Sequence, residues 1–96
     1  MKELFFSEKG IYYRINEFEE GKSTLVFIHG LSGSSSSWTE YEKRLESNYN
    51  ILNLDLRGHG TSKRYRNFQD YKLENITEDI RDLLQYLHID KCILFI

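Results

Sequence analysis

Two glycine-rich segments carry the residues whose types and spacing could do chemistry. Residues 29–34 read His-Gly-Leu-Ser-Gly-Ser, and residues 55–62 read Asp-Leu-Arg-Gly-His-Gly-Thr-Ser. A histidine can act as a general base, a serine as a nucleophile, and an arginine as the holder of a substrate carboxylate. The same side chains can instead brace a turn by hydrogen bonding. The elements that position the two segments decide between these uses.

Each segment comes at the end of an apolar run. Thr24–Ile28 precedes the first segment, and Ile51–Leu56 leads into the second. Continuous apolar runs of this length are typical of strands that are covered on both faces. In open α/β sheets, sites lie beyond the carboxyl ends of the parallel strands. We therefore expect both segments at the carboxyl edge of one sheet.

The remaining elements complete an α/β pattern. The predicted strands and helices are, in order, Leu4–Phe6, Ile11–Ile15, Thr24–Ile28, a helix from Ser37 to about Asn48, Ile51–Leu56, a helix over Leu73–His88, and Cys92–Ile96. Gly10 predicts a hairpin between the first two strands. The later alternation of strands and helices predicts parallel pairing through right-handed crossovers. The fold class is thus α/β, with a mixed sheet, the order β-β-β-α-β-α-β and a single domain over residues 1–96.

Capping and periodicity carry the two helix predictions. Ser37 and Glu40 fit a capping box at the start of the first helix. Trp38, Tyr41 and Leu45 then share one face. The apolar stripe of the second helix is predicted to consist of Leu73, Ile76, Ile80, Leu83, Leu84 and Leu87. Its solvent-facing side is predicted to hold Glu74, Glu78, Asp79, Arg81, Asp82 and Gln85.

The two glycine-rich segments together resemble the N-terminal part of the α/β-hydrolase superfamily. The H-G-x-x-G-S loop and the D-x-R-G-x-G-x-S turn stand in the family's order and follow the matching strands. The resemblance covers essentially the whole chain and implies a partial α/β-hydrolase fold. It also implies that Cys92–Ile96 pairs with Thr24–Ile28 in parallel, on the side opposite to Ile51–Leu56.

The resemblance gives the first loop a role in oxyanion binding. In this family a serine attacks an acyl carbon, and two backbone N–H groups hold the developing oxyanion. One of the two donors is implied to be the N–H of Leu31, whose side chain would line the acyl pocket. His29, Gly30 and Gly33 are implied to support this loop. The family's catalytic base comes late in the chain, so His29 is interpreted as a brace.

The nucleophile of the family lies on a G-x-S-x-G elbow, just after the strand equivalent to Cys92–Ile96. None of the candidate serines of this chain, which are Ser32, Ser34–Ser37 and Ser62, occupies such an elbow. No catalytic residue is therefore assigned, and we expect the chain by itself to hydrolyse no acyl ester. One hypothesis is the N-terminal fragment of a serine-type hydrolase acting on a small ester, thioester or related carbonyl substrate. The alternative is a non-catalytic truncated domain that associates with itself through Cys92–Ile96.

Other chemically suggestive residues are given structural interpretations. We interpret Asp55 and Arg57 as braces of the second turn, and His59 and His88 as structural. The basic run at residues 63–66 is interpreted as a solvated loop, although the resemblance implies a place near the entrance to the acyl site, where it could meet an anionic substrate. A dinucleotide site is the remaining alternative, but residues 30–33 supply only two of the three glycines of that fingerprint.

Composition limits the classes of partner. The hydrophobic fraction is 40% and the formal net charge is −2, which suits a globular protein and argues against general binding to nucleic acid or membrane surfaces. Cys92 has no partner for an internal disulfide and is expected to be a buried thiol. No metal-ligand spacing or cofactor motif is present, so none is predicted. The N-terminus does not fit a signal peptide, and we expect a cytoplasmic protein.

Overall fold

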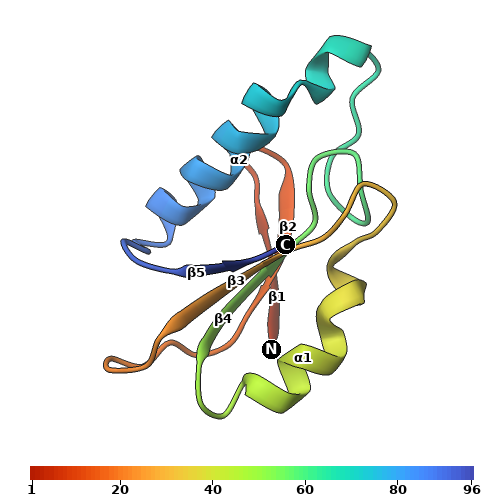
Figure 1. Cartoon of the computed structure of the whole chain (residues 1–96). Helices are drawn as coiled ribbons and strands as arrows, with labels where there is room; N and C mark the ends of the chain where they lie inside the picture. The colour runs from red at the N-terminus through yellow and green to blue at the C-terminus, as the bar shows by residue number, and fades with distance from the viewer.

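The apolar runs form a five-stranded mixed sheet in the computed structural model, which describes all residues 1–96. The strands are β1 Lys2–Phe6, β2 Ile11–Ile15, β3 Thr24–Ile28, β4 Asn50–Leu54 and β5 Ile93–Phe95. They lie in the order β1-β2-β4-β3-β5 (Figure 1). The first two form the expected antiparallel hairpin, which turns at Gly10 with a φ of +68°. The predicted fold class is confirmed.

The central strand β3 has a parallel neighbour on each side. Leu25 pairs with Ile51 of β4 and with Ile93 of β5. The predicted pairing of the last strand with the third is therefore confirmed. Because β3, β4 and β5 are parallel, their carboxyl ends, and the loops that follow β3 and β4, lie at the same edge of the sheet.

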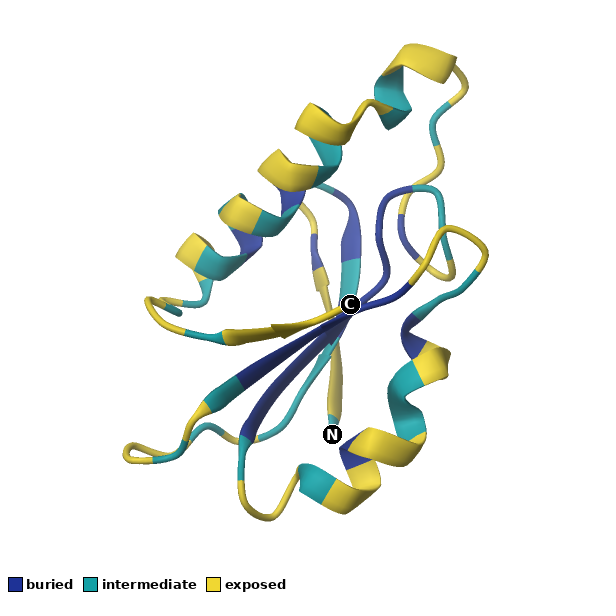
Figure 2. Ribbon diagram, viewed as in Figure 1, coloured by how far each residue is buried: buried dark blue, intermediate teal, exposed yellow.

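Two helices, α1 (Thr39–Leu45) and α2 (Leu73–Tyr86), cover opposite faces of the sheet (Figures 1 and 2). Alternate residues of a strand point to opposite faces, and the core accordingly divides in two. Val26 and Leu52 pack toward the α2 side, whereas Phe27 packs against the α1 side. The ring of Trp38 stacks on Phe27 with centroids 4.8 Å apart. The buried strands β3 and β4 are thus held on both faces.

The first helix begins differently from the prediction. A 3-10 helix, Ser35–Trp38, comes first, and its N-cap is Ser34, whose side chain accepts a hydrogen bond from the backbone N–H of Ser36. The α-helix starts only at Thr39 and has no side-chain cap. The capping box at Ser37 and Glu40 was therefore wrong. The carboxylate of Asp55 receives the N–H of Ser35, and this long-range contact determines where the turn begins.

The second helix agrees with the prediction in extent but differs at two side chains. Leu73 is 73% exposed, and Asp79 is 1% exposed. Leu73 lies in the first turn, beyond the edge of the sheet, whereas Asp79 lies on the buried side because it pairs with Arg57. The assignment of Leu73 to the apolar stripe and of Asp79 to the solvent face was wrong. The helix ends where His88 adopts a φ of +58°.

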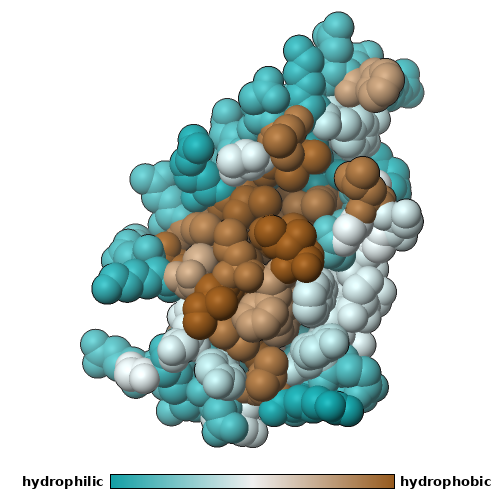
Figure 3. Space-filling view, viewed as in Figure 1, coloured by the Kyte–Doolittle hydropathy of each residue, from teal (hydrophilic) through white to brown (hydrophobic).

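The last strand is exposed along its outer edge (Figure 2). Ile93 and Leu94 are each 51% exposed, and Ile96 is 87% exposed. Apolar side chains gather over this strand and the C-terminus in Figure 3. Cys92, just before the strand, is only partly buried, and burial raises the pKa of its thiol. None of the helices combines the length and apolar composition needed to cross a bilayer.

Candidate active-site edge

The two glycine-rich segments meet at the carboxyl edge of the sheet, as expected. The first leaves β3 at His29, and the second leaves β4 at Asp55. The imidazole rings of His29 and His59, one from each segment, lie with their centroids 4.9 Å apart. The segments are therefore in contact through side chains as well as being neighbours along the edge.

His29 is a buried brace, with 3% of its surface exposed. Its Nε2 accepts the backbone N–H of Leu56 at 3.0 Å, and its Nδ1 lies 2.6 Å from the carbonyl oxygen of Gly30. Since a carbonyl only accepts, the ring is the neutral tautomer with its proton on Nδ1. Burial is the main cause that lowers the pKa of His29, which agrees with a neutral ring.

The Gly30–Leu31 peptide is held by its carbonyl and free at its N–H. The oxygen of Gly30 receives the Nδ1–H of His29 and the N–H of Gly33, the latter at 3.0 Å. In a trans peptide the C=O and N–H groups point in opposite directions. The N–H of Leu31 thus points away from these partners, and no group of the chain accepts it.

The surroundings of this peptide are open. Leu31 is 79% exposed, and no atom lies within 4 Å of the position that a Cβ on Gly30 would take. A Cβ on Gly33 would instead lie 3.1 Å from the side-chain oxygen of Ser37. The chain is therefore tightly packed beside Gly33, whereas the space beside Gly30 is empty.

The carboxylate of Asp55 is hydrogen-bonded to residues on either side of it in the chain and so connects the loop after β3 with the turn after β4. Its carboxylate accepts the N–H of Ser35 at 2.6 Å and the N–H of Thr61 at 2.9 Å. The side chain of Ser62 donates to the carbonyl of Asp55 and accepts the N–H of Tyr12 from the hairpin. All these contacts are structural, in agreement with the interpretation of Asp55 as a brace.

Arg57 is also a brace, because each of its three guanidinium nitrogens donates a hydrogen bond inside the chain. It donates to both carboxylate oxygens of Asp79, at 2.6 and 2.8 Å, and to the carbonyl of Asp70. The hydrogen bond with Asp79 raises the pKa of Arg57 above its ordinary value. The ring of Tyr65 covers the guanidinium at 4.4 Å. The face of the guanidinium that could hold a carboxylate through two parallel hydrogen bonds is occupied by Asp79.

The turn at residues 58–61 is held by hydrogen bonds to two of its carbonyl groups. The guanidinium of Arg64 donates to the carbonyl oxygens of Gly58 and Gly60. Lys63 lies over the ring of Tyr65, with its Nζ 4.9 Å from the ring centroid. Two members of the basic run thus support the turn in addition to facing solvent.

His59 contacts the first glycine-rich segment, which the sequence did not reveal. Its Nε2 lies within hydrogen-bonding distance of the carbonyl oxygen of Leu31, and its Nδ1 lies 2.9 Å from the carbonyl oxygen of Arg57. The prediction that His59 is structural named neither partner. The sequence feature that could have pointed to this contact is the position of His59 between Gly58 and Gly60. Both glycines adopt a positive φ and so form a sharp turn that projects the His59 side chain.

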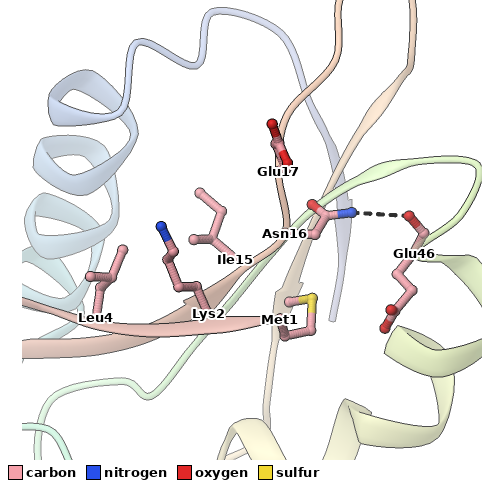
Figure 4. A pocket seen from close by; sticks show the side chains of 7 residues that line it. All are labelled: Met1, Lys2, Leu4, Ile15, Asn16, Glu17 and Glu46. Carbon is pink, nitrogen blue, oxygen red and sulfur yellow. Dashed lines mark hydrogen bonds between the residues drawn. The ribbon is translucent and has the colours of Figure 1, made fainter.

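Cavities lie both near this edge, where one of about 630 Å³ includes Ile28 and Leu94, and away from it. One of about 720 Å³ is lined by Met1, Lys2, Leu4, Ile15, Asn16, Glu17 and Glu46 (Figure 4). It lies at the opposite, amino-terminal end of the parallel strands, where β2 ends beside the start of β4. Its one side-chain amide, on Asn16, is already bonded to the carbonyl of Glu46. No three His, Cys, Asp or Glu side chains are grouped so as to hold a metal ion.

Known proteins share both the sequence and the architecture of this chain. The model of the alpha/beta hydrolase fold family matches residues 23–96. The Mus musculus protein named epoxide hydrolase 4 is 36% identical over 76 residues, which are 79% of this chain and 21% of that protein. The sn-1-specific diacylglycerol lipase of Danio rerio is 38% identical over 78 residues, which are 78% of this chain and 24% of that protein.

Solved structures of other proteins share the fold of this chain. The N-acyl homoserine lactonase AidH is 26% identical with a TM-score of 0.79, over 98% of this chain and 34% of that one. The haloalkane dehalogenase DpaA from Paraglaciecola agarilytica, at 16% identity, shares the fold with a TM-score of 0.87 over 97% of this chain and 33% of that one. The chain spans about a fifth to a quarter of the length of the two curated relatives. With its sheet order, its two glycine-rich segments and the family model in agreement, the chain belongs to the α/β-hydrolase fold family.

Proposed function

We propose that the chain is the N-terminal part of a serine-type hydrolase that acts on a small ester, thioester or related carbonyl compound. In this proposal the N–H of Leu31 is one of the two donors that hold the oxyanion. The single observation that carries the proposal is the Gly30–Leu31 peptide, whose carbonyl is held on the inside while its N–H has no acceptor in the chain.

The physical reason is preorganisation. Negative charge appears on the carbonyl oxygen of an acyl substrate only as the nucleophile attacks, so a donor that is already in place stabilises the transition state without rearrangement. His29 and Gly33 hold the peptide in that orientation before any substrate arrives. The empty space beside Gly30 leaves room for the substrate to approach.

The nucleophile, the acid and the base are supplied by a further segment in this proposal. The carboxyl end of β5 lies at the same edge as Leu31 because β5 runs parallel to β3. A serine on an elbow just after β5 would then emerge beside the oxyanion loop.

Opening of an epoxide is the second candidate reaction, favoured by the names of several curated relatives. It also develops negative charge on an oxygen atom, which a free N–H can stabilise. The two candidates differ in the substrate and in the nucleophile.

The test begins with the nucleotide sequence that follows the codon for Ile96. A continuing frame with an early G-x-S-x-G supports the proposal, and a stop codon there favours the non-catalytic domain that associates through β5. The full-length protein is then assayed with a p-nitrophenyl ester, with an aryl epoxide, and with a serine-directed fluorophosphonate.

The expected result is ester turnover that the fluorophosphonate abolishes, and no turnover by residues 1–96 alone. Epoxide turnover that resists the fluorophosphonate would transfer the proposal to the second candidate. Ester turnover by residues 1–96 alone would overturn the assignment of the nucleophile to another segment.

A further inference from the structure

We infer that His59 is a positioning residue for the oxyanion donor, acting through the carbonyl group of Leu31. The inference rests on the proposed function, since the role of the Leu31 N–H belongs to that proposal. His59 comes from the second glycine-rich segment, 28 residues after Leu31, and it reaches across to the first.

A hydrogen bond from His59 to the carbonyl of Leu31 requires a proton on Nε2. Both ring nitrogens face carbonyl oxygens, Nε2 that of Leu31 and Nδ1 that of Arg57. Carbonyl oxygens only accept, and a neutral imidazole has a single N–H. The contact with Leu31 therefore exists in the neutral form protonated at Nε2 and in the doubly protonated form.

Two imidazoles together determine the conformation of Leu31. His29 holds the carbonyl of Gly30, and His59 holds the carbonyl of Leu31 itself. These carbonyls belong to the two peptide planes on either side of the Cα of Leu31, and each plane is rigid. The N–H of Leu31 lies in the first of these planes. Holding the second plane as well restricts rotation about φ and ψ of Leu31, so the contact with His59 helps to keep the first plane in its orientation.

Side-chain packing does not hold Leu31 in this conformation. The side chain of Leu31 is mostly exposed and contributes to neither hydrophobic core. A loop residue without buried apolar contacts is ordinarily mobile. The hydrogen bonds to the flanking carbonyls are therefore what keep the donor in place.

His59 is itself held by a rigid support. Gly58 and Gly60 adopt φ angles of +78° and +50°, which give the turn its sharp bend. Arg64 donates to the carbonyls of both glycines, and Asp55 accepts the N–H of Thr61. These hydrogen bonds hold the turn that carries His59, and so they position its imidazole ring against the loop that contains Leu31.

Two substitutions separate the contact with Leu31 from the contact within the turn. In His59→Gln the amide nitrogen extends to about the position of Nε2, so it can still donate to Leu31. In His59→Asn the shorter side chain reaches only the position of Nδ1, so it can donate to the carbonyl of Arg57 alone. Both variants are neutral amides, which makes each the control for the other.

The full-length protein is assayed with a p-nitrophenyl ester. We expect His59→Asn to lower kcat about ten-fold with little change in KM, because a misplaced oxyanion donor weakens binding of the transition state and not of the substrate. His59→Gln should recover most of that kcat. Thermal unfolding of both variants provides the stability control, and the two midpoints should agree.

A second measurement is independent of catalysis. Nuclear magnetic resonance of the full-length protein labelled with ¹⁵N-leucine reports the order of the Leu31 amide. This amide should be as rigid in His59→Gln as in the unchanged protein and more mobile in His59→Asn.

A kcat for His59→Asn equal to that of the unchanged protein would overturn the inference, as would equal losses in the two variants. If the unchanged protein turns over no ester, the proposed function fails. The mobility of the Leu31 amide, measured by nuclear magnetic resonance, then tests the positioning role of His59 by itself. Equal mobility of that amide in all three proteins would then overturn it.

Discussion

The carboxylate of Asp79 and the guanidinium of Arg57 form a bidentate ion pair inside the chain, with contacts of 2.6 and 2.8 Å. The side chains are only 2% and 9% exposed. This pair joins the second glycine-rich segment to α2, and so fastens the site edge to the helix that covers the sheet. Removing one partner would leave a charge buried without compensation.

Asp79→Asn should therefore destabilise the chain by about 3–5 kcal/mol. The double variant Arg57→Met with Asp79→Leu should be less destabilised than Asp79→Asn, because no buried charge is left unpaired. Urea unfolding of the three proteins measures the differences. An Asp79→Asn variant as stable as the unchanged chain would contradict the buried pair.

The glycine turn provides a second prediction. A Cβ on Gly60 would lie 2.2 Å from the carboxylate oxygen of Asp55, and Gly60 has a φ of +50°. Gly60→Ala should cost more than about 3 kcal/mol, since it combines a clash with backbone strain. Gly21, at a φ of +89° with no atom within 4 Å, is the matched control.

Gly21→Ala should cost only about 1–2 kcal/mol, because strain is its sole penalty. Thermal or urea unfolding compares the two variants. Equal losses at the two glycines would show that the carboxylate of Asp55 does not constrain the turn.

The stability of the chain should fall as the pH decreases below about 6.5 because of His29. Burial lowers the pKa of His29 below its ordinary 6.5, so below that pH the unfolded chain binds a proton that the folded chain does not. The contribution of His29 to the free energy of unfolding is thus fully present above about pH 6.5 and is lost as the pH falls through the folded pKa. The pKa of Glu78 is lowered from 4.5 by Lys9, so its contribution is lost only at lower pH.

Urea unfolding at a series of pH values tests this. His29→Gln should show a weaker dependence on pH, whereas His88→Asn should keep it. Asn suits His88 because it tolerates the positive φ of that position. A dependence on pH that survives His29→Gln unchanged would assign it to another group.

The outer edge of β5 should govern self-association of the 96-residue chain. Exposed apolar edge strands pair with other chains unless a charge interrupts them. Leu94 is 51% exposed, so a lysine there can extend its ammonium into water. Leu94→Lys should make the chain more soluble and more monomeric in sedimentation velocity.

Val26→Lys provides the contrast. Val26 pairs with Leu94 in the neighbouring strand and is fully buried, so a lysine at this position should unfold the chain. If Leu94→Lys also unfolds the chain, β5 is part of the core and not an exposed edge.

Much of the fold was predictable from local patterns. The apolar runs of Thr24–Ile28 and Ile11–Ile15 coincide with β3 and β2, because a strand that is buried or half-buried needs a particular run of residue types. The chirality of the crossovers then left few arrangements for the parallel strands. The interpretation of His29 as a brace came from the resemblance, because the family's catalytic base lies late in the chain, and both of its ring nitrogens contact backbone groups.

The sequence by itself determined the elements, the fold class and the two segments that meet at the site edge. Only the tertiary structure decided which groups face each other there. The pairing of Arg57 with Asp79 spans 22 residues and the contact of His59 with Leu31 spans 28. The N-cap moved from Ser37 to Ser34 for a similar reason, because Asp55, 20 residues beyond Ser35, captures the N–H of that residue. Such contacts depend on how α2 and the turns are placed over the sheet, and no local periodicity encodes that placement.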